Sequence, residues 1–249
     1  MPTVQQLYEL WAADSELREE LQHSLEPRGL DSLYETFGAL GPTAGELLVD
    51  VGARDGKHAV ELARRYGVRA GAVDPMPQHA DVLEATAESL PFEDGSVDWI
   101  WCRDVLVHVD VPRALAEFAR VLRPGGAAVV YVTLPTDRLE PQEAERLART
   151  CALTGYTAEQ VEFAAVAAGL SLHSADRLGT EWRESMIENG AWDTAADLLA
   201  LARLDRRRDA LVERYGEAAA DAAWGGLVWG IYQMLGKLEP TVFVWEKRA

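Results

Sequence analysis

Short apolar runs alternate with amphipathic stretches through the middle of the chain. The runs are rich in β-branched residues and have the length of buried strands. They occupy 47–51, 69–73, 82–85, 97–102 and 127–133. Apolar residues at helical spacing lie between several of them, clearly at 111–122 and more weakly at 77–81. This alternation predicts a mainly parallel sheet with helices on both faces.

The region before the first strand is helical in pattern. Apolar residues recur at helical spacing from Val4 onward, and either Asp14 or Ser15 is positioned to cap a second helix. A third short helix is expected at 30–40. Because 48% of the residues are hydrophobic, the chain has enough apolar surface for a sizeable core and a helical cap.

The region after the alternation adds two strands and a long helical stretch. Thr157 opens a capping-box pattern that begins a helix ending at Gly169. Strands are expected at 170–178 and 241–245, and the residues between them are mostly helical in pattern. We expect this insertion to fold back over the carboxyl edge of the sheet.

The predicted fold class is α/β, a doubly wound and mainly parallel seven-stranded sheet of the Rossmann-like type. An N-terminal helical cap is expected at 1–40. The α/β core comprises 41–180 and 239–249, and the helical insertion covers 181–238.

The first predicted strand ends at a candidate ligand site. Asp50 closes the strand, and Gly52 and Gly56 then form a tight turn into a helix. In an open α/β sheet, ligands bind at the carboxyl ends of the strands. Asp74 ends the second strand, where a carboxylate is placed to accept hydrogen bonds from ribose hydroxyls. The pattern therefore predicts a cofactor that contains a nucleoside.

Composition narrows the possible partners and location. The net charge of −17 disfavours nucleic acid, whose phosphates a strongly acidic surface repels. No apolar run is long enough to span a membrane. With two cysteines no disulfide framework is expected, so we expect a cytoplasmic protein. High Ala and Arg content suggests a bacterial source. His23, His58, His79 and His173 lack metal-ligand spacing, and no metal is expected.

Two other nucleotide-binding patterns are absent. A dinucleotide site requires Gly-x-Gly-x-x-Gly, but Arg54 stands between the two glycines of the first turn. No Gly-Lys-Ser/Thr follows the first strand, so the chain has no P-loop.

Four motifs in order resemble class I S-adenosylmethionine-dependent methyltransferases, especially the small-molecule branch called type 11. Residues 50–56 are similar to that family's Asp-x-Gly-x-Gly-x-Gly motif, and Asp74 corresponds to its ribose-binding acid. Residues 87–98 resemble its DAExLPFxDxSFD signature, and 120–126 resemble its RVLKPGG turn. The resemblance covers about residues 47 to 133 well and the flanks loosely.

The resemblance implies a set of residues around S-adenosylmethionine. The set is Tyr34, Asp50, Gly52, Ala53, Arg54, Gly56, Asp74, Met76, Thr86, Ala87, Cys102 and Arg103. Some members have a purely structural alternative. Tyr34 either closes over the methionine end of the cofactor or packs in the core, and Met76 either lies on the adenine or packs elsewhere.

Two positions depart from the family pattern. Arg54 replaces the middle glycine, where a Cβ restricts the turn if the backbone needs a positive φ. Its guanidinium either pairs with the cofactor carboxylate or points to solvent. Thr86 stands where the family often has an Asp for the adenine amino group. Either Thr86 accepts that hydrogen bond, or the Ala87 backbone reads the adenine.

His108 is the candidate catalytic residue. It follows the fourth strand among apolar residues, where the family frequently has a His. It is either a general base that takes a proton from the acceptor or a structural His bonded to loop backbone. Glu181, Trp182 and Tyr232 belong to the helical insertion and are expected to contact the acceptor.

The expected activity is methyl transfer to an O, N or C atom of a small-molecule metabolite, with S-adenosylhomocysteine as product. Bacterial specialised metabolism and a homodimer are further expectations. One alternative is a cofactor-binding protein of the same fold with a non-methylating role. Another is a nucleotide-cofactor oxidoreductase, which the missing glycine pattern disfavours.

Overall fold

The computed structural model describes residues 1–12 and 15–248. The strands are β1 (Leu47–Val51), β2 (Arg69–Asp74), β3 (Leu83–Glu84), β4 (Val97–Arg103), β5 (Leu122–Pro135), β6 (Leu170–Arg177) and β7 (Leu238–Lys247). The helices before and within the alternation are α1 (Val4–Ala12), α2 (Ser15–Glu20), α3 (Leu30–Ala39), α4 (Lys57–Tyr66), η1 (Leu106–His108, a 3-10 turn) and α5 (Val111–Val121). The later helices are α6 (Pro141–Cys151), α7 (Ala158–Ala167), α8 (Glu181–Glu188), α9 (Thr194–Arg206), α10 (Arg208–Tyr215) and α11 (Glu217–Met234).

The seven strands form one sheet in the order β3-β2-β1-β4-β5-β7-β6. β1 pairs in parallel with β2 and β4, whereas β7 runs antiparallel to both β5 and β6. The predicted fold class, a mainly parallel doubly wound α/β sheet, is confirmed. Since strand order reverses between β1 and β4, this sheet has its ligand crevice at their carboxyl ends.

Alternating side chains along β5 supply both layers of the core. Val130 and Val132 face a cluster that contains Phe118 of α5, and α7 packs on the same cluster. Val129 and Tyr131 face the opposite cluster, to which α3, α4 and α8 contribute. Because successive strand residues point to opposite faces, a nearly continuous apolar run is what a strand covered on both sides requires.

The largest difference from the predicted elements lies between β2 and β3. Residues 77–81 form turns rather than the expected helix, so that prediction is wrong. Pro75 and Pro77 each disfavour helical backbone at the residue before them. Gln78 N–H also donates to the Arg54 carbonyl at 2.8 Å, which ties the segment to the first turn. The Thr157 capping box is present as predicted, with Gln160 as its partner.

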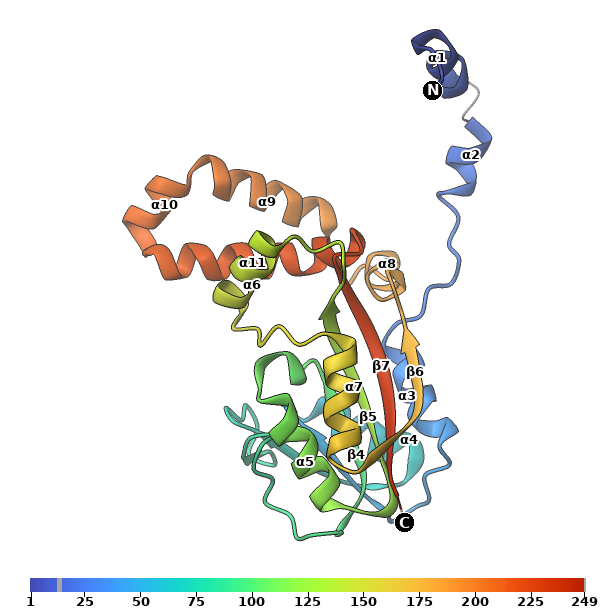
Figure 1. The fold of residues 1–249 in the computed structure, drawn as a ribbon, viewed down its shortest axis with the longest axis vertical. Coiled ribbons are helices and arrows are strands. Elements are labelled where there is room, and N and C mark those ends of the chain that lie inside the picture. The colour runs from blue at the N-terminus through green and yellow to red at the C-terminus, as the bar shows by residue number, and fades with distance from the viewer. Residues whose placement is uncertain (13–14, 249) are drawn as a thin grey trace.

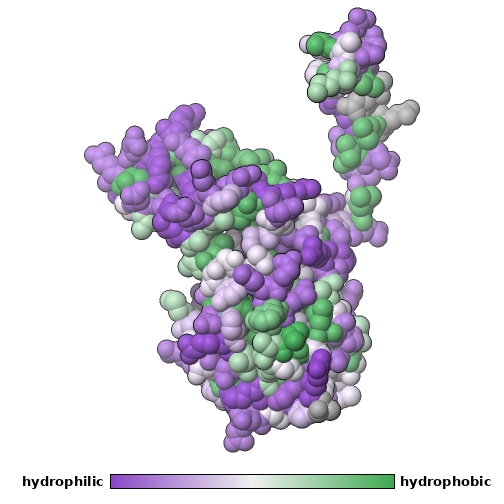
Figure 2. Space-filling view, in the orientation of Figure 1, coloured by the Kyte–Doolittle hydropathy of each residue, from purple (hydrophilic) through white to green (hydrophobic). Residues whose placement is uncertain are grey.

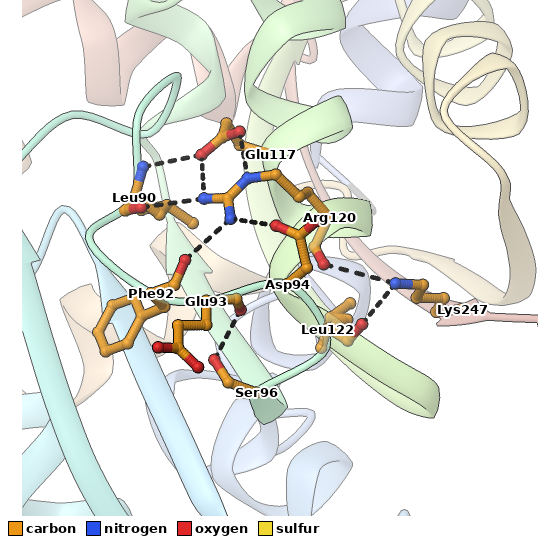
Figure 3. Close-up of polar contacts among 9 residues, drawn as sticks. All are labelled: Leu90, Phe92, Glu93, Asp94, Ser96, Glu117, Arg120, Leu122 and Lys247. Atoms are coloured by element: carbon orange, nitrogen blue, oxygen red, sulfur yellow. Dashed lines mark hydrogen bonds and ion pairs between the residues drawn. The ribbon is translucent and has the colours of Figure 1, made fainter.

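The two later motifs have a structural role (Figure 3). The Arg120 guanidinium donates to the carbonyl oxygens of Leu90 and Phe92 at 3.0 and 2.9 Å. It also pairs with Glu117 and with Asp94, each at 2.7 Å. Arg120, the first residue of the 120–126 motif, therefore fastens the loop that precedes β4 to helix α5.

Helices α8, α9, α10 and α11 gather with α6 at one end of the sheet (Figure 1). α11 contacts α6, α8, α9, α10 and β7. Leu147, Leu204, Trp224, Val228 and Leu238 make a separate apolar cluster there. No helix within the described residues has the length and apolarity needed to cross a membrane.

Among the helices described before residue 41, only α3 contributes buried side chains to the sheet core. α2 begins at Ser15, and the alternative cap at Asp14 lies outside the described residues. α1 and α2 extend away from the body of the molecule (Figure 1), and Figure 2 shows apolar surface along them. Val4, Tyr8 and Leu21 are among their exposed apolar residues.

Candidate active site

In the turn from β1 to α4, every second residue from Gly52 to Gly56 has left-handed backbone. φ is +77° at Gly52, +51° at Arg54 and +76° at Gly56. A Cβ on Gly52 would lie 2.1 Å from Cγ2 of Val105, which follows β4, so the backbone at this position leaves no room for a side chain. Arg54 adopts the positive φ that its position demands, at a cost of roughly 1 kcal/mol for a residue with a Cβ.

The Asp74 carboxylate stabilises this turn through hydrogen bonds to the backbone. Its Oδ2 accepts a hydrogen bond from Arg54 N–H at 2.9 Å, and its Oδ1 accepts one from Met76 N–H at 2.7 Å. The residue is buried. A carboxylate has about four lone-pair sites, so two of them remain for a ligand. Asp74 therefore has a structural task in addition to the predicted contact with ribose.

A cavity of about 690 Å³ opens beside the turn. That volume lies within the usual range for small-molecule and cofactor sites. Its lining includes six predicted cofactor residues, namely Tyr34, Asp50, Gly52, Ala53, Arg54 and Arg103. It also includes Leu30, Asp55, Lys57, His58, Glu61 and Gln78, which the sequence did not single out.

Asp50 is the buried charge of this cavity. It is 2% exposed, and its Oδ2 has no hydrogen-bond partner within the described residues. Burial raises the pKa of Asp50 to about 7, although a hydrogen bond from Ala59 N–H and the positive charge of Arg103 act in the opposite direction. A buried oxygen without a partner is costly, and a cationic or hydrogen-bond-donating ligand group would satisfy it.

Tyr34 and His58 form a neutral pair at one wall. The Tyr34 hydroxyl lies 2.7 Å from His58 Nδ1. Burial, together with the charge of Arg103, lowers the pKa of His58 to about 4, so its imidazole is neutral at pH 7. Tyr34 also stacks on Trp101, with ring centroids 5.5 Å apart. The sequence placed Tyr34 here but missed His58, whose only signal is its position in the first turn of α4.

Six predicted cofactor residues are outside the cavity lining, namely Gly56, Asp74, Met76, Thr86, Ala87 and Cys102. Met76 is 79% exposed, and Thr86 is exposed as well. Ala87 is buried. Cys102 is buried in the sheet core, where burial raises the pKa of its thiol. The backbone beside Thr86 closes a turn, because Ser89 N–H donates to the Thr86 carbonyl at 3.1 Å.

His108, the candidate base, ends η1 and is exposed. Its Nδ1 lies 3.3 Å from the carbonyl oxygen of Ala152. The residue comes one short turn after Arg103, but it is not part of the cavity lining among the described residues. This contact with loop backbone is the one expected if His108 has a structural role, and it leaves His108 Nε2 free to contact solvent or a ligand.

The three predicted acceptor residues are spread over the helical insertion. Glu181 forms an ion pair with Arg28 at 2.8 Å and thereby joins α8 to the segment before α3. Trp182 is buried against Tyr131, with ring centroids 4.6 Å apart. Tyr232 donates to Glu143 at 3.0 Å, so it packs α11 against α6. The structure does not bring these three side chains together.

Within residues 1–12 and 15–248, no group of three or more His, Cys, Asp or Glu side chains is arranged to hold a metal ion.

Comparison with known proteins gives a consistent result. A family described as "Methyltransferase domain" matches residues 49–130. An uncharacterized methyltransferase of Mycobacterium tuberculosis is 41% identical over 102 residues, which cover 37% of this chain and 42% of that protein. The chain thus spans about two fifths of the length of such curated relatives.

Solved structures extend the likeness to most of the fold. The phosphoethanolamine N-methyltransferase 2 of Haemonchus contortus, solved with S-adenosylhomocysteine, superposes with a TM-score of 0.66 at 18% identity. It covers 90% of this chain and 54% of that chain. The [4+2]-cyclase SpnF superposes with a TM-score of 0.62 at 20% identity and covers 88% of this chain and 81% of that chain.

The matched segment contains Asp50, the glycine turn, α4 and β4, which supply most of the cavity lining, whereas Leu30 and Tyr34 of α3 lie before it. These matches support the resemblance found in the sequence: residues 49–130 match a family described as a methyltransferase domain, and the fold is shared with a solved N-methyltransferase that contains S-adenosylhomocysteine.

Proposed function

We propose that this protein binds S-adenosylmethionine in the cavity beside Gly52 and transfers its methyl group to an O, N or C atom of a small molecule. The observation that carries the proposal is the buried carboxylate of Asp50, whose Oδ2 has no hydrogen-bond partner within the described residues, at the switch point of the sheet. The solved relative that contains S-adenosylhomocysteine supports the choice of cofactor.

The residues present fit this cofactor. Asp50 offers an acceptor to its ammonium group, and Arg54 and Arg103 line the same cavity as donors for its carboxylate. The free lone pairs of Asp74 are available for the ribose hydroxyls. Thr86 and the Ala87 backbone are the proposed adenine contacts. Tyr34 and His58 close the wall with a neutral pair.

The cofactor supplies a methyl group already activated by a positively charged sulfur. The protein's task is then to hold the acceptor in line and to exclude water. A proton must leave only if the acceptor binds protonated, and His108 is the proposed base for that case. Its exposed position on η1 keeps the ring accessible to a ligand at the ends of β4 and β5.

Calorimetry tests the binding half of the proposal. The protein should bind S-adenosylmethionine and S-adenosylhomocysteine with saturating heats and should give none with NADH. Binding of NADH alone would favour the oxidoreductase alternative. Methyl release measured over a panel of oxygen, nitrogen and carbon acceptors then tests turnover, and S-adenosylhomocysteine should accumulate with at least one of them.

A non-methylating role is the second candidate, because the cyclase SpnF shares this fold. Fold alone does not select a reaction. Tight S-adenosylhomocysteine binding with no methyl release over the whole panel would favour this candidate.

We further propose a cytoplasmic bacterial protein of specialised metabolism that acts on a metabolite rather than on nucleic acid or membrane. The charge of −17 supports the exclusion of nucleic acid. A homodimer is also proposed, and sedimentation of the full chain tests it. The helical insertion at 181–238 and the N-terminal segment 1–40 are the proposed caps over the acceptor, although in this structure α1 and α2 extend away from the body and α3 alone of the described N-terminal helices packs on the sheet.

A further inference from the structure

A polar cluster lies next to the cofactor cavity, between the sheet and the helical insertion. We call Asp104, Tyr131, Thr133, Arg183 and Gln233 the cap cluster. Asp104 follows β4, the next two residues lie on β5, and the last two lie on α8 and α11. Asp104 N–H donates to the Tyr131 carbonyl at 2.8 Å, and Thr133 N–H donates to Asp104 Oδ1 at 2.9 Å. Arg183 Nε–H donates to Gln233 Oε1 at 2.9 Å.

Arg103 connects this cluster with the cofactor cavity. Its charge acts on Asp50 and His58 on the cavity side. It also acts on Asp104 and Arg183 on the other side. Arg103 lines the cofactor cavity and lies opposite Tyr131 of the cap cluster in the sheet. A ligand in the cap cluster would therefore lie beside the cofactor, where the acceptor of a methyl group has to be.

Within the described residues, Arg183 lacks the carboxylate partner that other half-buried arginines of this chain have. Arg28, Arg120 and Arg123 each pair with a carboxylate. In the part of the chain that the structure describes, no carboxylate oxygen lies within 4.0 Å of the Arg183 guanidinium. Burial lowers the pKa of Arg183. The charges of Asp104 and Asp197 offset part of this desolvation from beyond ion-pair distance, but no direct counter-ion compensates it within the described residues.

Neutral contacts nevertheless hold Arg183 in one orientation. Its guanidinium lies 5.2 Å from the ring of Trp192 and donates to Met186 Sδ at 3.3 Å. Trp192 is itself fixed, because its Nε1–H donates to Asp197 at 2.6 Å. A Cβ on Gly230 would lie 2.7 Å from that indole, so the glycine admits the ring against α11. Contacts of this kind pre-orient a guanidinium to bind a carboxylate or a phosphate.

A further buried donor lacks a partner in the same cluster, because Gln233 is 0% exposed and its Nε2 has no hydrogen-bond partner within the described residues. The Thr133 hydroxyl, on a side chain that is 2% exposed, forms no hydrogen bond of normal geometry, although it lies close enough to the Asp104 carboxyl to lower the pKa of that group. Buried polar groups normally have a partner, so each of these points to a bound polar group. The donors of the cluster are a guanidinium, a hydroxyl and an amide N–H, and the ligand that matches them is an oxyanion. Burial raises the pKa of Asp104 and so favours the uncharged form of this neighbouring carboxyl group, which does not repel an anion.

We propose that the cap cluster binds an anionic group of the acceptor, a carboxylate or a phosphate, with Arg183 as its principal contact. Thr133 and Gln233 supply neutral donors, and Gln233 also positions the guanidinium. Calling this ligand the acceptor rests on the proposed methyltransferase function, whereas the presence of an oxyanion site does not.

The test uses the full chain and the tryptophans beside Arg183. Sodium phosphate and sodium acetate are titrated separately against tryptophan fluorescence, with sodium chloride as the ionic-strength control. Arg183→Met removes an unpaired, half-buried charge and should leave the fold intact. Arg206→Met removes an exposed charge from the same helical insertion and is the matched control.

The wild-type protein and Arg206→Met should saturate with at least one of the two anions. Arg183→Met should bind it about tenfold more weakly or worse, the size expected for a lost charge-assisted hydrogen bond. Tighter binding of phosphate or of acetate identifies the class of anion. The inference is overturned if neither anion saturates the wild type, or if Arg183→Met binds as the wild type does.

A second variant guards against misfolding of the first. Gln233→Glu places a carboxylate on Arg183 from within, so it should abolish anion binding without weakening the fold against urea. Unchanged anion binding in a folded Gln233→Glu protein would also overturn the inference. Calorimetry with S-adenosylhomocysteine is run on every variant. Loss of that binding in the wild type would refute the proposed function and leave the anion result standing.

Discussion

Replacing Asp50 by Asn should stabilise the protein at neutral pH by an amount that depends on pH. Burial raises the pKa of Asp50 from 3.8 to about 7 in the folded state. At about 1.4 kcal/mol for each pH unit between the folded and unfolded values, the folded protein loses about 4 kcal/mol on ionising this group. Asp50 is 2% exposed, so solvent screening does little to reduce the figure.

The sign follows from which state holds the proton. Below about pH 4 both states are protonated, and Asp50 does not affect the free energy of unfolding. Between about pH 4 and pH 7 the unfolded chain releases this proton while the folded chain retains it, so stability falls as the pH rises. Above about pH 7 the full cost remains. Asn cannot ionise and escapes this loss, while its side-chain oxygen can still accept from Ala59 N–H.

Urea unfolding of the wild type and Asp50→Asn, followed at several pH values from 4 to 8, measures the difference. The variant should match the wild type near pH 4 and exceed its free energy of unfolding by up to about 4 kcal/mol near pH 8. Asp137→Asn, at an exposed turn residue, should show no such trend. A difference that does not change with pH, or a variant that is less stable at pH 8, would refute the reasoning.

The same substitution should impair cofactor binding, since the gain in stability and the ligand contact come from one carboxylate. S-Adenosylhomocysteine should bind Asp50→Asn more weakly by roughly 1.5–3 kcal/mol, the range for a hydrogen bond to a charged group. Calorimetry at pH 8, where the wild-type carboxylate is ionised, measures this loss. Equal affinities would separate Asp50 from the ammonium group of the cofactor.

Three further predictions concern the rim of the cavity. Gly52→Ala places a Cβ 2.1 Å from Val105 at a φ of +77°, so it should cost about 1–3 kcal/mol in urea unfolding and should weaken S-adenosylhomocysteine binding. The double variant with Val105→Ala should recover part of the loss, and no recovery would exclude this clash as the cause. Arg54→Gly should be about 1 kcal/mol more stable than Arg54→Ala, because only Ala retains a Cβ at φ +51°. Both should lose the same cofactor affinity in calorimetry if the guanidinium contacts the cofactor, and unequal losses would assign the effect to the backbone. His108→Ala should lower turnover by ~10²–10⁴ with S-adenosylhomocysteine affinity unchanged, whereas unchanged turnover would make His108 a structural residue.

The chain's local pattern was sufficient to predict the sheet. β1 coincides with the predicted 47–51, and β2 and β4 each extend one residue past the prediction. Strands covered on both faces have continuous apolar runs, which are visible without knowledge of the partner strands. The helix predicted at 77–81 failed because two prolines and a hydrogen bond to the Arg54 carbonyl outweigh a weak apolar spacing.

The candidate site was predictable only where its residues lie in one short motif. Gly52, Arg54 and Gly56 are close in sequence, and their turn carries a recognisable spacing. His58 was passed over, because its pairing with Tyr34 joins two helices that the sequence cannot orient. Arg120 belongs to a motif that was read as a sign of family, yet its side chain serves as a clamp (Figure 3).

The sequence by itself determined the strands, the glycine turn and the family of the domain, because each depends on residues within a few positions of one another. Only the tertiary structure decided which charges are buried and which are paired. Within the described residues, Asp50 Oδ2 lacks a hydrogen-bond partner because the sheet and α4 enclose it, and Arg183 contacts Gln233 and Met186 rather than a carboxylate. Burial and ion pairing depend on elements far apart along the chain, and no local pattern of residues encodes those contacts.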